Sequence, residues 1–424
     1  MPTSELPRLL ADFSRPAGLI KQDYGDFQVE EIPLYPPAGS GSHTYFLIEK
    51  SGLTTAQAVD DLARVLGVRR FDIGYAGLKD ARAVTRQWMS VEHVPPERVA
   101  AVNLPRLQVL EVSQHRNKLR LGHLQGNHFR IRVRQTAAHR LAELQDALAR
   151  LAAVGVPNFF GPQRFGERGD TWEVGRAVVR GDLGEALDVV LGRPRPTEHG
   201  SIRHARELYQ SGHYDMAVRH WPGMFHDARR ALKALIRSKG DKKRAFLAID
   251  RNTRQFYISA YQSYLFNQVL AERLPTGLGQ LQAGDLAWLH RNGAVFAVED
   301  AAAEQARADA FEISPTGPLF GYRMSAPSGA AGELEERVLA REELSRNVFR
   351  SDRLRIKGGR RPLRFPIADA RIQLGADEAG TYLELSFSLP RGCYATTVLS
   401  ELFDLSPGAR EPAEAGLEED AEEA

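Results

Sequence analysis

Two adjacent charged residues, Lys79 and Asp80, stand in the segment GLKDARA at residues 77–83. The runs on either side of it, FDIGYAG and VTRQWMSV, have the short apolar character of buried strands. A loop anchored by sheet at both ends is where a rigid scaffold can hold a reactive carboxylate. An ordinary hairpin turn with two solvated side chains is the alternative interpretation. Asp80 is therefore a candidate acid that the local residues alone do not establish.

Patterns that accompany several other chemistries are missing from the sequence. It contains no GxxxxGKS or GxxxxGKT phosphate loop, no GxGxxG turn between strand and helix, and no GxSxG nucleophile elbow. Cys393 is the only cysteine, and the twelve histidines form no HExxH pattern. We therefore expect no metal, no cofactor and no internal disulfide.

The segments that must position Asp80 have the periodicities of an α+β domain. In the run 127–134, Phe129, Ile131 and Val133 alternate with arginines, which predicts one core face and one face of guanidinium groups. A helix is expected from Thr55 to the residue before Gly67, because apolar residues recur there at helical spacing. Further expected elements are strands at 27–32, 44–49, 71–77, 84–91, 107–113 and 118–124, and a helix at 138–153.

After Gly155 the chain becomes helix-rich, and strand periodicity returns near the end, where Leu383, Leu385 and Phe387 alternate. This pattern predicts a discontinuous sheet domain at residues 1–154 and 352–424, interrupted by a helix-rich insertion at 155–351. Periodicity alone does not decide whether the last strands rejoin the first sheet.

The net charge of +2 conceals an asymmetry, because residues 411–424 hold seven acidic groups and no basic ones. Without this segment, 56 basic groups face 47 acidic ones, a balance that favours polyanionic partners. The acidic segment is expected to be disordered. No apolar run is long enough to cross a membrane, and the first residues, MPTSELPRLL, lack the basic start, apolar core and cleavage site of a signal peptide, so we expect a cytoplasmic protein.

Five sequence motifs are distributed along the chain: DFQVE at residues 26–30, GxKDxxAxTxQ at 77–87, GNxFxxxxR at 126–134, PNxFGxQRFG at 157–166 and LPxGxYATxVLxEL at 389–402. Together they resemble the motifs of the TruD family of tRNA pseudouridine synthases. Their order and near end-to-end coverage make the resemblance specific. It implies a pseudouridine synthase fold with a mixed or antiparallel sheet, and identifies residues 155–351 as a TruD-specific insertion domain.

The resemblance also implies a reaction, the isomerisation of a uridine in tRNA to pseudouridine without cofactor or metal, at position 13 of the glutamate tRNA in bacterial members. Asp80 matches the family's catalytic aspartate, acting either as nucleophile on the sugar or as base. A lysine is expected to keep it ionised. Lys21 is the preferred partner, and Lys79 is the second choice because adjacent side chains commonly diverge.

An extruded base also needs a surface on which to stack. By resemblance, Phe27 and Phe129 lie around the target uracil and Asn127 bonds its edge, although Phe129 shares its strand face with core residues. Gln163 and Arg164 are weaker candidates for RNA contact.

Several alternatives remain open from the sequence. A non-catalytic RNA-binding protein with the same scaffold is the main one, and a hydrolase that releases the base is the second. A long stretch between Gly169 and Arg254, which the shortest bacterial members lack, makes the exact substrate less secure than the reaction. We expect a monomer, with no protein partner implied.

Overall fold

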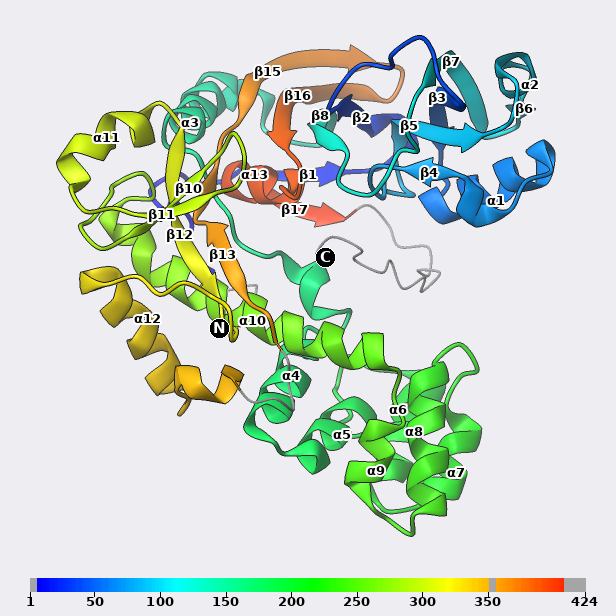
Figure 1. The fold of residues 1–424 in the computed structure, drawn as a ribbon, viewed down its shortest axis with the longest axis vertical. Coiled ribbons are helices and arrows are strands. Elements are labelled where there is room, and N and C mark those ends of the chain that lie inside the picture. The colour runs from blue at the N-terminus through cyan, green and yellow to red at the C-terminus, as the bar shows by residue number, and fades with distance from the viewer. Residues whose placement is uncertain (1–5, 351–355, 408–424) are drawn as a thin grey trace. The chain divides into compact units, whose positions relative to one another are not determined.

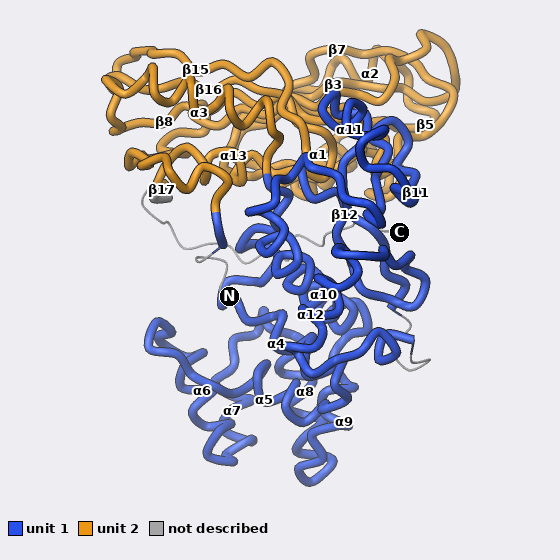
Figure 2. Tube along the Cα trace, turned by 90° about the vertical axis from the view of Figure 1, so that its left-hand side faces the viewer, with its two compact units in different colours: residues 1–7, 157–364 blue, residues 8–156, 365–424 orange. Residues whose placement is uncertain are grey.

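The computed structural model describes residues 6–350 and 356–407, and the chain divides into two compact units (Figure 2). The sheet unit is the described part of residues 8–156 and 365–424, and the helical unit is that of residues 1–7 and 157–364. The chain passes between them at β9 (Val156–Pro157) and β14 (Arg364–Phe365), which pair with each other. The predicted acidic tail, 411–424, lies outside the described residues.

An eleven-stranded mixed sheet forms the centre of the sheet unit (Figure 1). Strand β16 (Gly380–Pro390) pairs antiparallel with β8 (Leu124–Arg134), with Tyr382 opposite Arg134 and Pro390 opposite Gly126. The end of the chain therefore rejoins the first sheet. The neighbours β2 and β5 are parallel. These features confirm the α+β prediction. The main path, in spatial order, is β15 (Ala368–Asp377), β16 (Gly380–Pro390), β8 (Leu124–Arg134), β2 (Phe27–Pro33), β5 (Val84–Glu92), β3 (His43–Ser51), β7 (Leu107–His115) and β6 (Asn103–Leu104), and the strands β1 (Ala17–Ile20), β17 (Asp404–Pro407) and β4 (Gly74–Tyr75) pair beside it.

Helices cover this sheet because strands and helices each bury one apolar face. Phe129, Ile131 and Val133 of β8 are all buried, as their alternation predicted. The helices are α1 (Thr55–Leu66), α2 (Pro96–Ala100), α3 (Leu141–Val154) and α13 (Ala395–Leu402). The first of them begins with a capping box at Thr54 and ends at Gly67, whose φ of 63° is the left-handed conformation that glycine tolerates, so its predicted end is confirmed.

Two predicted strands are wrong or too long. Residues 118–123 form a loop, because Leu119 is buried against the sheet while Leu121 is exposed, so the run has no continuous core face. The strand expected at 71–77 shrinks to β4, because a 3-10 turn at Arg70–Asp72 occupies its beginning. Both runs are apolar enough to predict strands, but in the structure the first is a loop and the second is mostly not strand.

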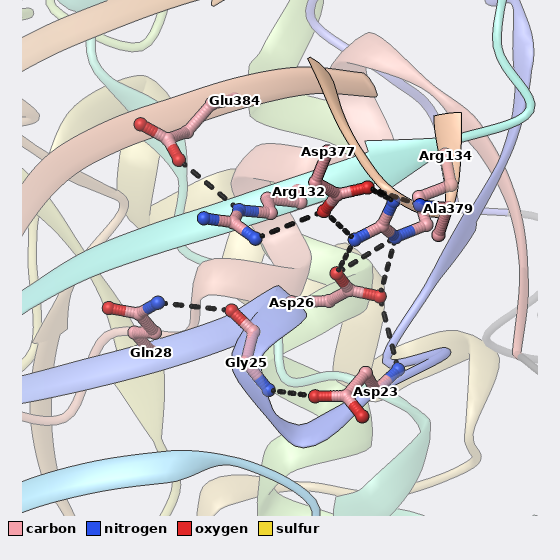
Figure 3. Close-up of polar contacts among 9 residues, drawn as sticks. All are labelled: Asp23, Gly25, Asp26, Gln28, Arg132, Arg134, Asp377, Ala379 and Glu384. Carbon is pink, nitrogen blue, oxygen red and sulfur yellow. Dashed lines mark hydrogen bonds and ion pairs between the residues drawn. The ribbon is translucent and has the colours of Figure 1, made fainter. Parts of the chain in front are cut away.

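The guanidinium face of β8 is also less uniform than predicted, because Arg134 is buried while Arg130 is exposed. Figure 3 shows the carboxylates around Arg134. Arg134 donates to both oxygens of Asp26 at 2.7 to 3.0 Å and to both oxygens of Asp377 at 2.6 and 2.9 Å. These carboxylates, Asp377 first, raise the pKa of Arg134. Asp26 is 1% exposed and accepts the backbone N–H of Asp23, so the pair holds the turn before β2.

Helices dominate the helical unit, as expected after Gly155, with a four-stranded sheet beside them. Its long helix, Arg251–Arg273, buries a set of residues that includes Tyr261 and Leu265. None of the described helices is long and apolar enough to cross a membrane. The elements are α4 (Thr171–Arg180), α5 (Leu183–Leu191), α6 (Gly200–Gln210), α7 (Tyr214–His220), α8 (His226–Arg237), α9 (Lys242–Leu247), α10 (Arg251–Arg273), α11 (Ala301–Asp309) and α12 (Gly329–Arg341), with the strands β10 (Leu286–Leu289), β11 (Val295–Ala297), β12 (Ile313–Leu319) and β13 (Gly359–Pro362).

The substitution Arg134→Leu tests the Asp26 contact. It leaves a buried carboxylate without its cation, so we expect the sheet unit to lose roughly 3 to 5 kcal/mol of its free energy of unfolding. Amide hydrogen exchange of β2 and β8 in urea measures this loss. Arg130→Leu removes an exposed arginine of the same strand and should change the value by less than about 0.5 kcal/mol. Equal losses in the two variants would contradict the role given to Arg134.

Candidate active site

Asp80 lies on the loop that joins β4 to β5, as the sequence predicted. Its side chain is 41% exposed, and Lys21 Nζ lies 3.5 Å from its Oδ2. Lys21 has a left-handed backbone, with φ at 57°, and its carbonyl accepts a hydrogen bond from Arg82 on the Asp80 loop. A cation at this distance stabilises the ionised carboxylate, although solvent screens a pair that is this exposed.

Lys79, the second candidate for this role, makes a different ion pair. Its Nζ lies 2.9 Å from Oε2 of Glu31, and the two side chains are only 4% and 1% exposed. Glu31 also accepts the backbone N–H of Trp88 on the neighbouring strand β5. Within the described chain, Lys21 is therefore the predicted lysine that pairs with Asp80, and Lys79 joins the loop to β2.

Three buried polar side chains hold the backbone of the same loop from inside the sheet unit. Lys50 Nζ donates to the carbonyls of Lys79 and Asp80 at 3.4 and 3.2 Å. The hydroxyl of Thr55 accepts the N–H of Lys79 at 2.9 Å, and the Gln87 amide donates to the Gly77 carbonyl at 3.3 Å. The Thr55 hydroxyl in turn donates to Gln87, so the three anchors are partly linked to one another. We call Lys50, Thr55 and Gln87 the loop anchors.

Neither Glu31 nor a role for the loop anchors was predicted from the sequence. The strand alternation nevertheless contains a signal for Lys50 and Gln87. On β3, Lys50 follows Phe46 and Ile48 on the core face, and on β5 Gln87 precedes Met89 on the core face. A polar residue at the end of a core-facing alternation needs a buried partner. The loop backbone is that partner for Lys50 and Gln87.

Both predicted aromatic residues belong to the hydrophobic core. Phe27 is 2% exposed and Phe129 is 7% exposed, and their rings meet edge to face with centroids 6.3 Å apart. Lys21 Nζ lies 4.2 Å from the centroid of the Phe27 ring, a cation–π distance. Contacts therefore run from Asp80 through Lys21 to Phe27 and Phe129.

Asn127 lies on β8, opposite Glu31 of β2 and Leu389 of β16. Its Oδ1 is buried and has no hydrogen-bond partner in the described structure. A buried acceptor left unpaired costs roughly 1 to 3 kcal/mol, so a bound donor would be favoured there.

Gln163 and Arg164 lie in the helical unit, on the 3-10 turn Pro162–Phe165. Gln163 is exposed, whereas the Arg164 guanidinium donates to the hydroxyls of Ser259 and Ser263 on α10. The described residues contain no group of three or more histidine, cysteine, aspartate or glutamate side chains arranged to hold a metal ion.

Breaking the Lys79 pair should affect stability. We expect Lys79→Met to cost roughly 3 to 5 kcal/mol of unfolding free energy, because it leaves the Glu31 carboxylate buried and unpaired. The double variant Lys79→Met, Glu31→Leu should recover most of that loss. Lys21→Met removes a partly exposed pair and should cost about 1 kcal/mol or less. Hydrogen exchange of β2 and β5 in urea compares the three, and equal losses for the two single variants would refute the assignment.

Comparison with known proteins places the chain in a family. The sequence model of the family described as tRNA pseudouridine synthase D (TruD) matches residues 6–402. The tRNA pseudouridine synthase D of Geobacter metallireducens is 47% identical over 395 residues, which cover 93% of this chain and 96% of that protein. That of Anaeromyxobacter dehalogenans strain 2CP-C is 38% identical over 400 residues, covering 94% and 96%.

Among solved structures, a crystal structure from Methanosarcina mazei that carries the name TruD superimposes with a TM-score of 0.81 at 28% identity, and the match covers 95% of both chains. This agreement confirms the predicted fold. The extent of these matches and the fold shared with the solved structure show that the chain belongs to the TruD family of tRNA pseudouridine synthases, which are isomerases.

Proposed function

We propose that Asp80 is the reactive group in the conversion of a tRNA uridine to pseudouridine. In this isomerisation the bond from N1 of the base to C1′ of the ribose breaks, the base turns, and C5 bonds to the same carbon. C5 loses its proton and N1 gains one, so the reaction consumes no other reactant and we propose that it needs no cofactor. The observation that carries the proposal is the ion pair between Lys21 Nζ and Asp80 Oδ2, 3.5 Å apart, with Asp80 on an anchored loop.

The carboxylate has two possible tasks, attack on C1′ or removal of a proton from the neighbouring sugar carbon. Both require the ionised form, which Lys21 stabilises. Both also require a fixed direction of approach, because reacting atoms must meet within roughly 3 to 3.5 Å. The loop anchors supply that fixation, since two of the carbonyls that they bind belong to Lys79 and Asp80.

We assign the binding of the extruded base to three side chains of the sheet unit. The nearly buried Phe27 ring lies next to Lys21, and the Phe129 ring lies next to that of Phe27, so a base placed there would meet an aromatic edge or face. Asn127 has an unpaired amide oxygen that can accept a hydrogen from a uracil N–H. We give Gln163 and Arg164 a secondary role at the RNA backbone, with Arg164 oriented by the hydroxyls of α10.

We also propose the substrate, the cellular compartment, the oligomeric state and the roles of the two domains. The substrate is uridine 13 of the glutamate tRNA, and the enzyme acts in the cytoplasm as a monomer. The predicted domain at 1–154 and 352–424 is catalytic, which agrees with the location of Asp80 and Lys21 in the sheet unit. The predicted insertion, 155–351, contributes further contacts with the tRNA.

The substitution Asp80→Asn tests the reactive group. It keeps the shape of the side chain but removes the carboxylate, so pseudouridine formation should fall by at least roughly 100-fold while tRNA binding is retained. The assay uses glutamate tRNA with labelled uridines and a matched tRNA with cytidine at position 13. Asp61→Asn alters another carboxylate with a basic partner, Arg64 at 3.1 Å, and should leave the rate near that of the native protein.

Other results of this assay would favour the alternatives. A native protein that binds the tRNA but forms no pseudouridine would be the non-catalytic RNA-binding protein. Release of free uracil would indicate a hydrolase. Full activity on the tRNA with cytidine at position 13 would move the target to another uridine.

The substitution Lys21→Met tests the cation beside Asp80. We expect kcat to fall by about 10-fold or more, equivalent to roughly 1.4 kcal/mol of transition-state stabilisation, with a smaller change in KM. Lys21→Arg keeps a positive charge and should lose less. The same loss of kcat in both variants would mean that the charge of Lys21 does not matter, and an unchanged kcat in Lys21→Met would exclude Lys21 from the reaction.

A further inference from the structure

Helix α8 carries a stripe of exposed basic side chains on the side opposite its core face. His226, Arg230, Lys233 and Arg237 are all exposed, and their spacings of four, three and four residues place them on one face. The opposite face is buried and consists of Ala228, Ala231, Leu232 and Leu235. The helix packs between α7 and α9 in the helical unit (Figure 1), so the stripe lies on the outside of a packed helix.

Positive charge is concentrated in this part of the sequence. Residues 200–254 contain thirteen lysines and arginines but only five acidic residues, a surplus of eight in a chain whose total charge is +2. Packing of the helices alone does not account for this surplus.

The basic groups of the stripe are poorly neutralised by the protein itself. In the described part of the chain, Lys233, Arg237 and the following Lys239 form no ion pair with a carboxylate, and all three are exposed. Arg230 lies 3.5 Å from Asp227, but that carboxylate also accepts bonds from the Thr253 hydroxyl and a backbone N–H.

Three arginines elsewhere in the same unit are paired with carboxylates. Arg203 pairs with Glu207, Arg307 pairs with Glu304 and Glu312, and Arg341 pairs with Glu272. Lys233, Arg237 and Lys239 therefore differ in charge pairing from these three arginines.

We propose that Arg230, Lys233, Arg237 and Lys239, the α8 basic surface, bind the phosphate backbone of the substrate tRNA. The inference rests on the proposed function, because that function makes tRNA the polyanion that the protein must hold. Lysine and arginine on a helix face suit phosphates, which they contact without reading sequence. The α8 basic surface therefore raises affinity for tRNA without acting on the reacting uridine.

The test is a triple variant, Lys233→Gln, Arg237→Gln, Lys239→Gln, compared with a control triple variant, Arg203→Gln, Arg307→Gln, Arg341→Gln. Both remove three positive charges whose side chains reach solvent, but only the first removes charges that lack carboxylate partners. Binding of glutamate tRNA is measured over a range of salt concentrations, and kcat is measured at saturating tRNA. Urea denaturation confirms that both variants are folded.

For the α8 variant we expect weaker tRNA binding, with the slope of log affinity against log salt reduced by roughly 2 to 3. Its kcat should stay within about twofold of the native value, because the lost contacts hold substrate and transition state equally. The control should keep the native slope. Equal losses of tRNA affinity in both variants would show an effect of net charge alone. No loss of affinity in the α8 variant would show that this face is only solvated. Either result overturns the proposal.

The outcome is separable from that of the proposed function. Pseudouridine formation by the native protein at saturating tRNA tests the reaction, whatever the two triple variants do. If the native protein forms pseudouridine and the α8 variant binds tRNA normally, the inference fails and the function stands. If the native protein forms none, the function fails on its own measurement.

Discussion

The site depends on the need of buried polar groups for partners. Lys50 and Gln87 are 1% and 0% exposed, and burial without hydrogen bonds would cost each of them more than a typical hydrogen bond contributes to stability. The carbonyls of Gly77, Lys79 and Asp80 meet that need. Because Lys50 and Gln87 project from the core faces of β3 and β5, the loop can leave its position only by unpairing them. The rigidity of the Asp80 loop thus follows from the cost of unsatisfied polar groups.

A second buried contact, between Arg134 and Asp26, constrains the Lys21 side of the Lys21–Asp80 ion pair. Arg134 holds Asp26, and Asp26 closes the turn Tyr24–Asp26 by accepting the N–H of Asp23. This turn lies between Lys21 and Phe27 in the chain, so its geometry affects the positions of both. The contacts at Arg134 are bidentate, a geometry that arginine provides and lysine does not. Two separate polar clusters therefore converge on the 3.5 Å contact between Lys21 and Asp80.

Local patterns predicted much of this structure. The alternation in β8, the end of α1 at Gly67 and the loop at Asp80 each follow from short-range rules, and the structure agrees with them. The strand predicted at 118–124 does not form over residues 118–123, because the apolar residues there are not all buried. Burial depends on tertiary contacts, which a local pattern does not specify. Pairs such as Lys79 with Glu31 join residues far apart in the chain, and no local pattern specifies such contacts. The family resemblance directed attention to Lys21, and the divergence of adjacent side chains made Lys79 the second choice.

The exposure of the Lys21–Asp80 pair bears on how the proposed reaction would begin. The two side chains are 22% and 41% exposed, so in the free protein water screens their attraction and the contact contributes little stability. A nucleotide bound over the pair would exclude that water and strengthen the attraction, because Coulomb energy rises as the effective dielectric constant falls. The same exclusion would disfavour a solitary carboxylate, which loses its hydration without compensation. Lys21 thus matters most when substrate covers the site, and its contribution belongs to turnover more than to folding.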